Sequence, residues 1–545
     1  MRKLLTYIIA VGIILLINLP GFCQTNFQTI AEKSDFQSTA NYEEVMANIA
    51  ALQKMSRNIR LEKIAHSTEG RDIPLLVIGN PLPKSPASMQ KDSRIVIYIQ
   101  ANIHAGEVEG KEASLMFARD LLSEKNQDIL KNVVFLICPL FNADGNQKIS
   151  PANRTHQNGP VNGVGVRYNG QFLDLNRDAM KMESPEVKGV ITSVFNRWDP
   201  SVFMDCHTTN GSYHIEPVTF TWMVNPNGDR SLINYMRDKM MPSMANTLRQ
   251  KYLTENCFYG EFDDMLKPEK GWMFDAAEPR YMTNYVGLRN RLAILDENYV
   301  YSDYKSRVLG CYHLIRSLAD YCAMNKTEIK NLVAEADKNT INRGLNPDQK
   351  DSLAIEYAVR PISEPVTIQT YEAELAGEVG GRKSYHKTDR RKTVTIPYFI
   401  DYYPTKSAKF PYAYLLTTQD PQILELLRMH GIQVERLSHE SSLEVERFEI
   451  TDLKGAQRLN QGHYNNTISG RKIMEKIAFP TGTVVVRTAQ PLANVAAYLL
   501  EPQSNDGLVV WNFLDRYLVP QWGSGYNTFP VFKVLNRVEI ASVPN

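Results

Sequence analysis

Residues 94–122 read RIVIYIQANIHAGEVEGKEASLMFARDLL. The run from Arg94 to Gln100 has the length and apolar composition of a buried strand, and Gly110 to Leu122 repeats its apolar residues at helical spacing. Only a short turn, which contains a histidine and a glutamate, separates the two. A buried strand followed at once by a helix is the unit from which α/β sheets are built.

The same alternation continues on both sides of this stretch. Residues 59–65 and 73–78 flank the turn signal Glu69-Gly70-Arg71-Asp72 and predict a hairpin. Further strands are predicted at 133–140, 201–205 and 291–296, and helices at 42–55, 183–198 and 304–324. We therefore predict an α/β fold with a mostly parallel mixed sheet flanked by helices, in which ligands bind at the carboxyl ends of the strands.

The chain has 545 residues, too many for one hydrophobic core, which favours two domains. Residues 326–349 are polar and charged and suit a linker helix. Beyond them come short β-like runs, such as 393–403 and 484–487, and a helix at 421–430. The predicted division is a first domain at 24–330, a linker or helical segment at 331–364 and a smaller β-rich C-terminal domain at 365–545. The C-terminal domain could serve as a packing module or could anchor the protein to a cell wall or carbohydrate.

The N-terminus has the form of a secretory signal peptide. Met1-Arg2-Lys3 is positively charged, an apolar stretch extends to about Leu19, and the small residues Gly21 and Cys23 suit a cleavage site. We predict a cleaved signal peptide at residues 1–23, a secreted or periplasmic location and no stable membrane span after removal of the signal. An uncleaved anchor is the alternative.

Composition limits the possible partners. Hydrophobic residues make up 43% and charged residues 22% of the chain, as in soluble globular proteins. The 61 basic and 60 acidic side chains create no large field that would attract nucleic acid, so no nucleic-acid partner is expected. The oligomeric state stays undetermined.

Three residues at predicted strand ends suggest a metal site. His104 and Glu107 follow the strand at 94–100, and His207 follows the strand at 201–205. His156 and His214 are alternatives, but neither directly follows a strand. Two imidazoles and one carboxylate leave one zinc position open for water, which is the catalytic arrangement, so we predict one Zn²⁺ per chain. Cobalt or manganese could occupy the same ligands.

A hydrolytic zinc site also needs a base and a cation for the developing oxyanion. Glu297 ends the predicted strand at 291–296 and competes with Asp296, because side chains alternate and only one of the two can face the site. Arg154 lies in a long polar loop. The pair Asn176-Arg177 offers an amide and a guanidinium fork suited to a carboxylate.

In this order the motifs resemble the zinc carboxypeptidase family of the carboxypeptidase A and B type. The family pattern is His-x-x-Glu, Asn-Pro-Asp-Gly, Asp-x-Asn-Arg, a later His and a catalytic Glu on a late strand. The matching elements here are His104-Ala-Gly-Glu107, Asn142-Ala-Asp-Gly145, Asp174-Leu-Asn176-Arg177, His207 and Glu297. The resemblance covers roughly residues 55–325.

The resemblance implies a carboxypeptidase-like fold, peptide or protein substrates and a role for each site residue. Zinc would be bound by His104, Glu107 and His207. The other implied roles are general base for Glu297, carbonyl and oxyanion contact for Arg154, terminal-carboxylate binding for Asn176 and Arg177, and orientation of His104 for Asp174. The family also has a tyrosine that closes over the substrate. We predict Tyr285, although spacing leaves Tyr281 open.

Two departures from the family pattern are visible. The usual Pro of Asn-Pro-Asp-Gly is Ala143, and the usual Asn after Asn-Arg is Asp178, whose charge puts strict exopeptidase activity in question. The leading expectation is a secreted zinc metallopeptidase that hydrolyses C-terminal peptide bonds. The alternatives are a zinc amidase or peptidase that acts on cell-wall peptides or small amides, and an inactive binding protein.

Overall fold

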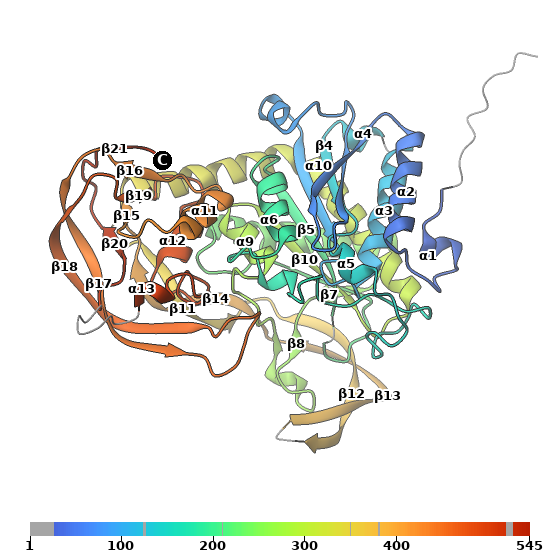
Figure 1. Ribbon diagram of the computed structural model, residues 1–545. Coiled ribbons are helices and arrows are strands. Elements are labelled where there is room, and N and C mark those ends of the chain that lie inside the picture. Colours follow the sequence, from blue (N-terminus) through green and yellow to red (C-terminus); the bar gives the residue numbers. More distant parts are fainter. Residues whose placement is uncertain (1–26, 124–126, 210, 349, 380–381, 519–526) are drawn as a thin grey trace, which may run out of the picture.

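The computed structural model describes residues 27–123, 127–209, 211–348, 350–379, 382–518 and 527–545. The predicted signal peptide lies outside the described residues, so it stays a prediction. Within the described part, no helix is long and apolar enough to cross a membrane. Figure 1 shows a sheet flanked by helices, built from the N-terminal half, with the strands of the C-terminal half beside it.

An eight-stranded mixed sheet forms the centre of the N-terminal half, with the strand order β1-β2-β4-β3-β5-β10-β6-β7. The central neighbours β4, β3, β5 and β10 are parallel, whereas β1, β2 and β6 join antiparallel. This confirms the predicted fold class. The strands are β1 (Ile59–His66), β2 (Asp72–Ile78), β3 (Ile95–Ala101), β4 (Val133–Cys138), β5 (Val202–Thr209), β6 (Val218–Trp222), β7 (Asn256–Phe258) and β10 (Leu292–Tyr299).

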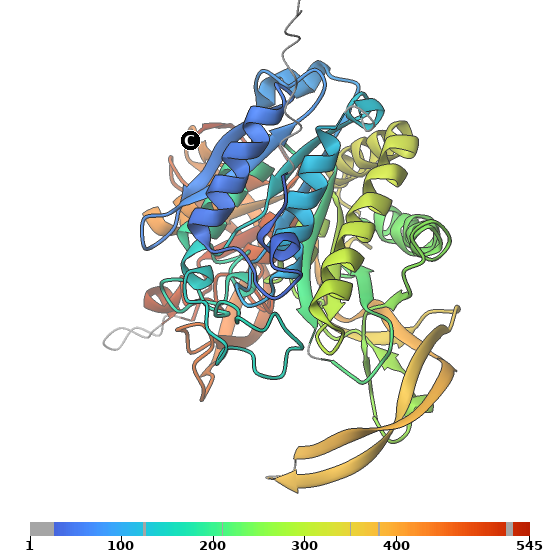
Figure 2. The same ribbon diagram turned by 90° about the vertical axis from the view of Figure 1, so that its right-hand side faces the viewer.

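Helices cover both faces of this sheet. Figure 2 shows α2, α3 and α10 side by side on one face. On this face Cys206 of β5 lies against the helices, and on the other face Phe203 packs edge-to-face against Phe195, at a ring distance of 5.6 Å. The helices of this half are α1 (Ile30–Lys33), α2 (Tyr42–Met55), α3 (Glu109–Leu121), α4 (Gln127–Leu130), α5 (Ala143–Asn146), α6 (Pro185–Val190), α7 (Arg230–Tyr235), α8 (Met241–Tyr252), α9 (Met282–Leu288) and α10 (Tyr304–Leu345).

Two predicted helices have different lengths from those expected. The helix predicted at 183–198 is α6, continued by a π-helical turn over Ile191–Phe195. The helix predicted at 304–324 and the linker helix predicted at 326–349 form one helix, α10, which ends at Leu345. Asn325 has non-helical backbone angles and donates its side-chain amide to Tyr321 O at 2.8 Å, so the helix kinks there without ending. The buried residues Ile329, Val333 and Ala336 then extend its apolar face.

The chain beyond α10 is rich in antiparallel strands, as predicted. β11 (Ser352–Pro361) and β14 (Tyr398–Lys409) form a four-stranded sheet with β9 (Trp272–Met273) and β8 (Glu261–Phe262) from the N-terminal half. Between β11 and β14, the hairpin of β12 (Val366–Val379) and β13 (Arg382–Ile396) projects away from the body (Figure 2). A strand pairing therefore connects the two halves, while the domain boundaries themselves stay a prediction.

The last part of the chain forms a seven-stranded sheet with the order β18-β17-β20-β15-β19-β16-β21. Its longest pair is the antiparallel hairpin of β17 and β18. The helix α12 is buried along its whole length and α11 on one side, and their apolar residues join the same hydrophobic core as the large sheet. The elements are β15 (Ala413–Leu416), α11 (Pro421–His430), β16 (Glu435–Leu437), β17 (Ser441–Gly455), β18 (Asn466–Phe479), β19 (Val484–Arg487), α12 (Ala493–Leu500), α13 (Asp515–Leu518), β20 (Val531–Val534) and β21 (Ser542–Pro544).

Candidate active site

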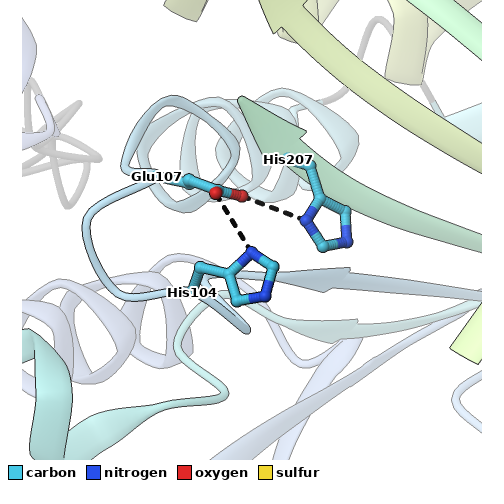
Figure 3. Close-up of side chains that lie close together, drawn as sticks. All are labelled: His104, Glu107 and His207. Atoms are coloured by element: carbon cyan, nitrogen blue, oxygen red, sulfur yellow. Dashed lines mark hydrogen bonds and ion pairs between the residues drawn. The ribbon is translucent and has the colours of Figure 1, made fainter. Parts of the chain in front are cut away.

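The three predicted metal ligands lie together at the carboxyl ends of β3 and β5. Glu107 Oε1 is 3.0 Å from His104 Nδ1, and Glu107 Oε2 is 3.0 Å from His207 Nδ1 (Figure 3). One candidate ligand atom from each residue lies within 4.8 Å of the others. All three side chains are at least 96% buried. The convergence that the metal-site prediction requires is therefore present.

A tight turn after β3 brings His104 and Glu107 to the same point. Asn102 adopts a left-handed backbone conformation, with φ of 65°, which asparagine tolerates better than most residues. Its side-chain amide donates to Glu107 O at 2.9 Å and to Ala105 O at 3.3 Å. The turn is thus held by a side chain that precedes both site residues in the sequence.

Each imidazole has a second carboxylate partner on its other nitrogen. His104 Nε2 is 3.0 Å from Asp174 Oδ1, and His207 Nε2 is 3.1 Å from Asp205 Oδ2. The contact between His104 and Asp174 is a hydrogen bond of the kind by which metal-binding histidines commonly engage a carboxylate through their second ring nitrogen, which fixes the tautomer. The contact between His207 and Asp205 is an ion pair. Both Nδ1 atoms are thereby directed at the shared centre, so the donor set fits a zinc ion.

The charges around the centre favour an ionised carboxylate. Burial opposes ionisation of Glu107, but His104 and Arg154 outweigh it and hold the pKa of the carboxyl well below its usual range. Burial likewise opposes protonation of His207, but Asp205 and Glu107 hold the pKa of its imidazole well above its usual range. A divalent cation bound between these groups would compete with the proton on the His207 ring.

A cavity of about 240 Å³ opens beside the three residues. Of the predicted site residues, its lining includes His104, Glu107, His207, Asn176, Arg177 and Glu297. Glu297 of β10 is in register with His207 of β5, which explains why both reach the same edge of the sheet. Burial raises the pKa of Glu297 to about 8, a shift that a nearby divalent cation would oppose.

Asp296, the competitor of Glu297, is directed to the opposite face of the sheet. It is fully buried near Cys206 and Cys311, and its Oδ2 accepts a hydrogen bond from Asn298 at 2.8 Å. Burial raises the pKa of Asp296 to about 8. The alternation of side chains along β10 therefore favours Glu297 as the carboxylate of the cavity.

The sequence did not single out Arg167, which lines the cavity. Its guanidinium contacts Asp174 Oδ2 at 2.9 Å through Nε and at 2.8 Å through Nη2, and its Nη1 is 3.8 Å from Glu107 Oε1. The only sequence signal was its position in the same loop, seven residues before Asp174. Arg154, which was predicted, pairs with Glu107 Oε1 at 2.7 Å and packs against Gly106 without lining the cavity.

The segment from Asp174 to Asp178 is held by its own side chains. Asp174 Oδ1 accepts from Asn176 N at 3.0 Å, Asn176 Oδ1 accepts from Met282 N at 3.0 Å, and the guanidinium of Arg177 lies 4.4 Å from the ring centre of Tyr281. Asp178 is fully buried and pairs with Lys181 at 2.8 Å. Its charge is compensated there, so it does not oppose a carboxylate bound at Arg177.

Of the two tyrosines, Tyr281 lines the cavity and Tyr285 does not. Tyr285 is fully buried, donates its hydroxyl to His430 Nδ1 at 2.8 Å and accepts from Arg289 at 3.1 Å. Burial lowers the pKa of His430 to about 3, so its neutral ring donates from Nε2 to Met180 O and accepts at Nδ1. These contacts assign Tyr285 to the core, and the predicted substrate contact passes to Tyr281, the alternative left open by the sequence.

The chain is similar in sequence to known carboxypeptidases. The family model described as zinc carboxypeptidase matches residues 43–283. Carboxypeptidase 2 of Trichophyton tonsurans is 22% identical over 496 residues, covering 86% of this chain and 81% of the relative. Carboxypeptidase 2 of Trichophyton rubrum is 22% identical over 488 residues, covering 83% of this chain and 80% of the relative.

Two of the solved structures found by comparison are carboxypeptidases. A metallo-carboxypeptidase from Burkholderia cenocepacia is 17% identical and has a TM-score of 0.38, with 52% of this chain and 70% of that chain covered. Carboxypeptidase A from Helicoverpa armigera is 18% identical and also has a TM-score of 0.38, with 52% and 75% covered. The family match over residues 43–283 is the stronger finding, and it includes the three candidate ligands but ends before Glu297.

The substitution Tyr285→Phe removes the hydroxyl that lies between His430 and Arg289. The buried Nδ1 of His430 then has no hydrogen-bond donor. We expect the free energy of unfolding to fall by about 1 to 3 kcal/mol, measured by urea denaturation. Tyr281→Phe, on the cavity wall, is the matched control and should change stability by less than about 0.5 kcal/mol. A larger loss for Tyr281→Phe would contradict the assignment of Tyr285 to the core.

Proposed function

We propose that this chain, whose residues 43–283 match the zinc carboxypeptidase family model, removes single residues from the C-termini of peptides. The chain is a metallocarboxypeptidase, a hydrolase of peptide bonds. The observation that carries the finer proposal is the cavity in which the His104, Glu107 and His207 set, the Glu297 carboxyl and the Arg177 guanidinium all meet.

In the proposed function one Zn²⁺ per chain is held by His104, Glu107 and His207. When bound there, zinc supplies Lewis-acid activation of a water molecule and of the scissile carbonyl. The fit is supported by the two Nδ1 atoms directed at the shared carboxylate and by the acidic partners on both Nε2 atoms. Asp174 and Asp205 keep the rings in that orientation.

Glu297 is the proposed general base. It takes a proton from the attacking water and delivers it to the leaving amine, so that one carboxyl serves both proton transfers. This role is supported by its place on the cavity wall and by its register with His207. Bound zinc would oppose the effect of burial, which raises the pKa of Glu297 to about 8, and would so favour the ionised form that a base requires.

Arg167 is the proposed cation for the oxyanion, in place of Arg154. A fixed guanidinium at the point where negative charge develops stabilises the transition state more than the ground state. Two contacts with Asp174 fix Arg167, which lines the cavity, whereas Arg154 pairs with Glu107 and does not line the cavity. Asn176 and Arg177 bind the terminal carboxylate of the substrate, and Tyr281 covers it.

We also propose that the chain is exported to the periplasm or outside the cell. The charged start, the apolar stretch up to about Leu19 and the small residues near Cys23 support a cleaved signal peptide. Peptides in such a compartment, including those of a cell wall, are the substrates within reach.

A peptide panel tests the proposed reaction. We expect release of single C-terminal amino acids, with peptides that end in an amide cleaved on the order of a hundredfold more slowly, because Arg177 loses its charged partner. Removal of zinc by a chelator should abolish hydrolysis and added Zn²⁺ should restore it. The products are identified by mass spectrometry. The amidase alternative would replace the proposal if the enzyme preferred internal bonds, cell-wall stem peptides or small amides.

Substitution Glu297→Gln keeps the shape of the base and removes its proton transfer. We expect kcat to fall by about 10² to 10⁴ while the zinc content stays at about one ion per chain. Asp296→Asn is the matched control, since this neighbouring carboxyl faces the other side of the sheet, and it should keep most of the activity. Steady-state kinetics and metal analysis decide, and full activity of the Glu297 variant would refute its role.

Two arginine variants separate the candidates for the oxyanion. Arg167→Ala should lower kcat by roughly 10² to 10³, whereas Arg154→Ala should lower it at least tenfold less. Both variants are compared by kcat and KM on one peptide, with zinc content as a control. The reverse order of effects would return the oxyanion role to Arg154.

A further inference from the structure

The hairpin of β17 and β18 ends in a loop, residues 456–465, that lies against the active-site segment. Its last turn consists of Gln461 and Gly462, with φ of 54° and 82°, between Asn460 and His463. Those two flanking residues exchange backbone hydrogen bonds of 2.9 and 3.0 Å. Positive φ at both central positions is typical of a tight two-residue hairpin turn, which holds its residues in fixed positions.

The side chains of Gln461 and His463 bind the turn to the rest of the protein. Gln461 Oε1 accepts a hydrogen bond of 2.8 Å from the backbone N–H of Asp174. His463 Nε2 lies 2.6 Å from Glu183 Oε1, its Nδ1 lies 2.9 Å from Asn512 Oδ1, and its ring packs edge-on against Trp511 at 5.4 Å. The tip is therefore anchored independently of the Gln461 contact.

Asp174 is the residue through which the tip reaches the active site. It is 96% buried, and its Oδ1 forms hydrogen bonds of 3.0 Å with His104 Nε2 and with the backbone N–H of Asn176. Its Oδ2 forms an ion pair with Arg167 Nη2 at 2.8 Å. Burial opposes ionisation, but His104 and Arg167 hold the pKa of Asp174 well below its usual range. One carboxylate thus sets the positions of a metal ligand, a cavity arginine and the start of the Asn176-Arg177 segment.

We propose that Gln461 is a positioning residue of the active site, which the C-terminal region supplies to fix the backbone of Asp174. The inference rests on the proposed function of the same site. Holding the amide of Asp174 from outside limits rotation of this residue, so its carboxylate keeps His104 and Arg167 in place together. Loss of a carboxylate that orients a metal-binding histidine typically costs ten- to a hundredfold in metal affinity or activity. Gln461 acts one contact further out, through Asp174, so the effect of its loss should lie at the lower end of that range.

Three variants of the full-length protein test the inference. Gln461→Met keeps the length of the side chain but removes the acceptor, and should lower kcat by about tenfold with KM changed less than about twofold, and weaken Zn²⁺ binding by about tenfold. Gln461→Glu restores an acceptor oxygen at the same reach and should recover most of kcat and zinc affinity. Leu459→Ala, on the same loop and 60% exposed, is the matched control and should match the wild type.

The Zn²⁺ dissociation constant, measured with a competing chelator, gives a readout that needs no substrate. If the wild type cleaves no peptide, the proposed function fails, but the order of zinc affinities among the variants still tests Gln461. The inference is overturned if Gln461→Met keeps both kcat and zinc affinity within twofold of the wild type. It is equally overturned if Gln461→Glu loses as much as Gln461→Met, or if Leu459→Ala does.

Discussion

The site depends on one buried carboxylate, Glu107, shared between the imidazoles of His104 and His207. A buried charge is stable only where partners compensate for the loss of water. Here they come from the two rings, from Arg154 and from the backbone amide of Thr208. This compensation requires β3 and β5 to be adjacent and parallel, so that both strands end at the same edge. The sheet order is thus the precondition of the chemistry.

The same sheet separates two groups of residues that are neighbours in sequence. On β5 and β10, His207 and Glu297 face the cavity, while Cys206 and Asp296 face the helices. The period of two along a strand makes this separation automatic once the register of the two strands is set. Glu297 thereby lines the cavity, and its neighbour Asp296 is buried in the core.

The C-terminal region takes part in the architecture of the catalytic half. β14 extends the strand pair of β8 and β9, and residues in and around that pair, such as Glu261 and Phe274, line the cavity. Arg280 pairs with the fully buried Asp506 at 2.9 Å, just before Tyr281. The cavity wall is therefore held in place by residues that follow it by more than a hundred positions in the sequence. A catalytic half without them would lose part of this support.

The sequence by itself determined the central α/β sheet, the β-rich C-terminal part and the grouping of His104, Glu107, His207 and Glu297, because strand periodicity and strand ends are local signals. It did not determine that the helices predicted on either side of residue 325 are one, that Arg167 and Tyr281 line the cavity, or that Gln461 contacts Asp174. Arg154 and Arg167 occupy one polar loop, and Tyr281 and Tyr285 occupy one short stretch, with no local difference that separates them. Their positions follow from contacts between segments distant in the chain, and only the tertiary structure brings such segments together.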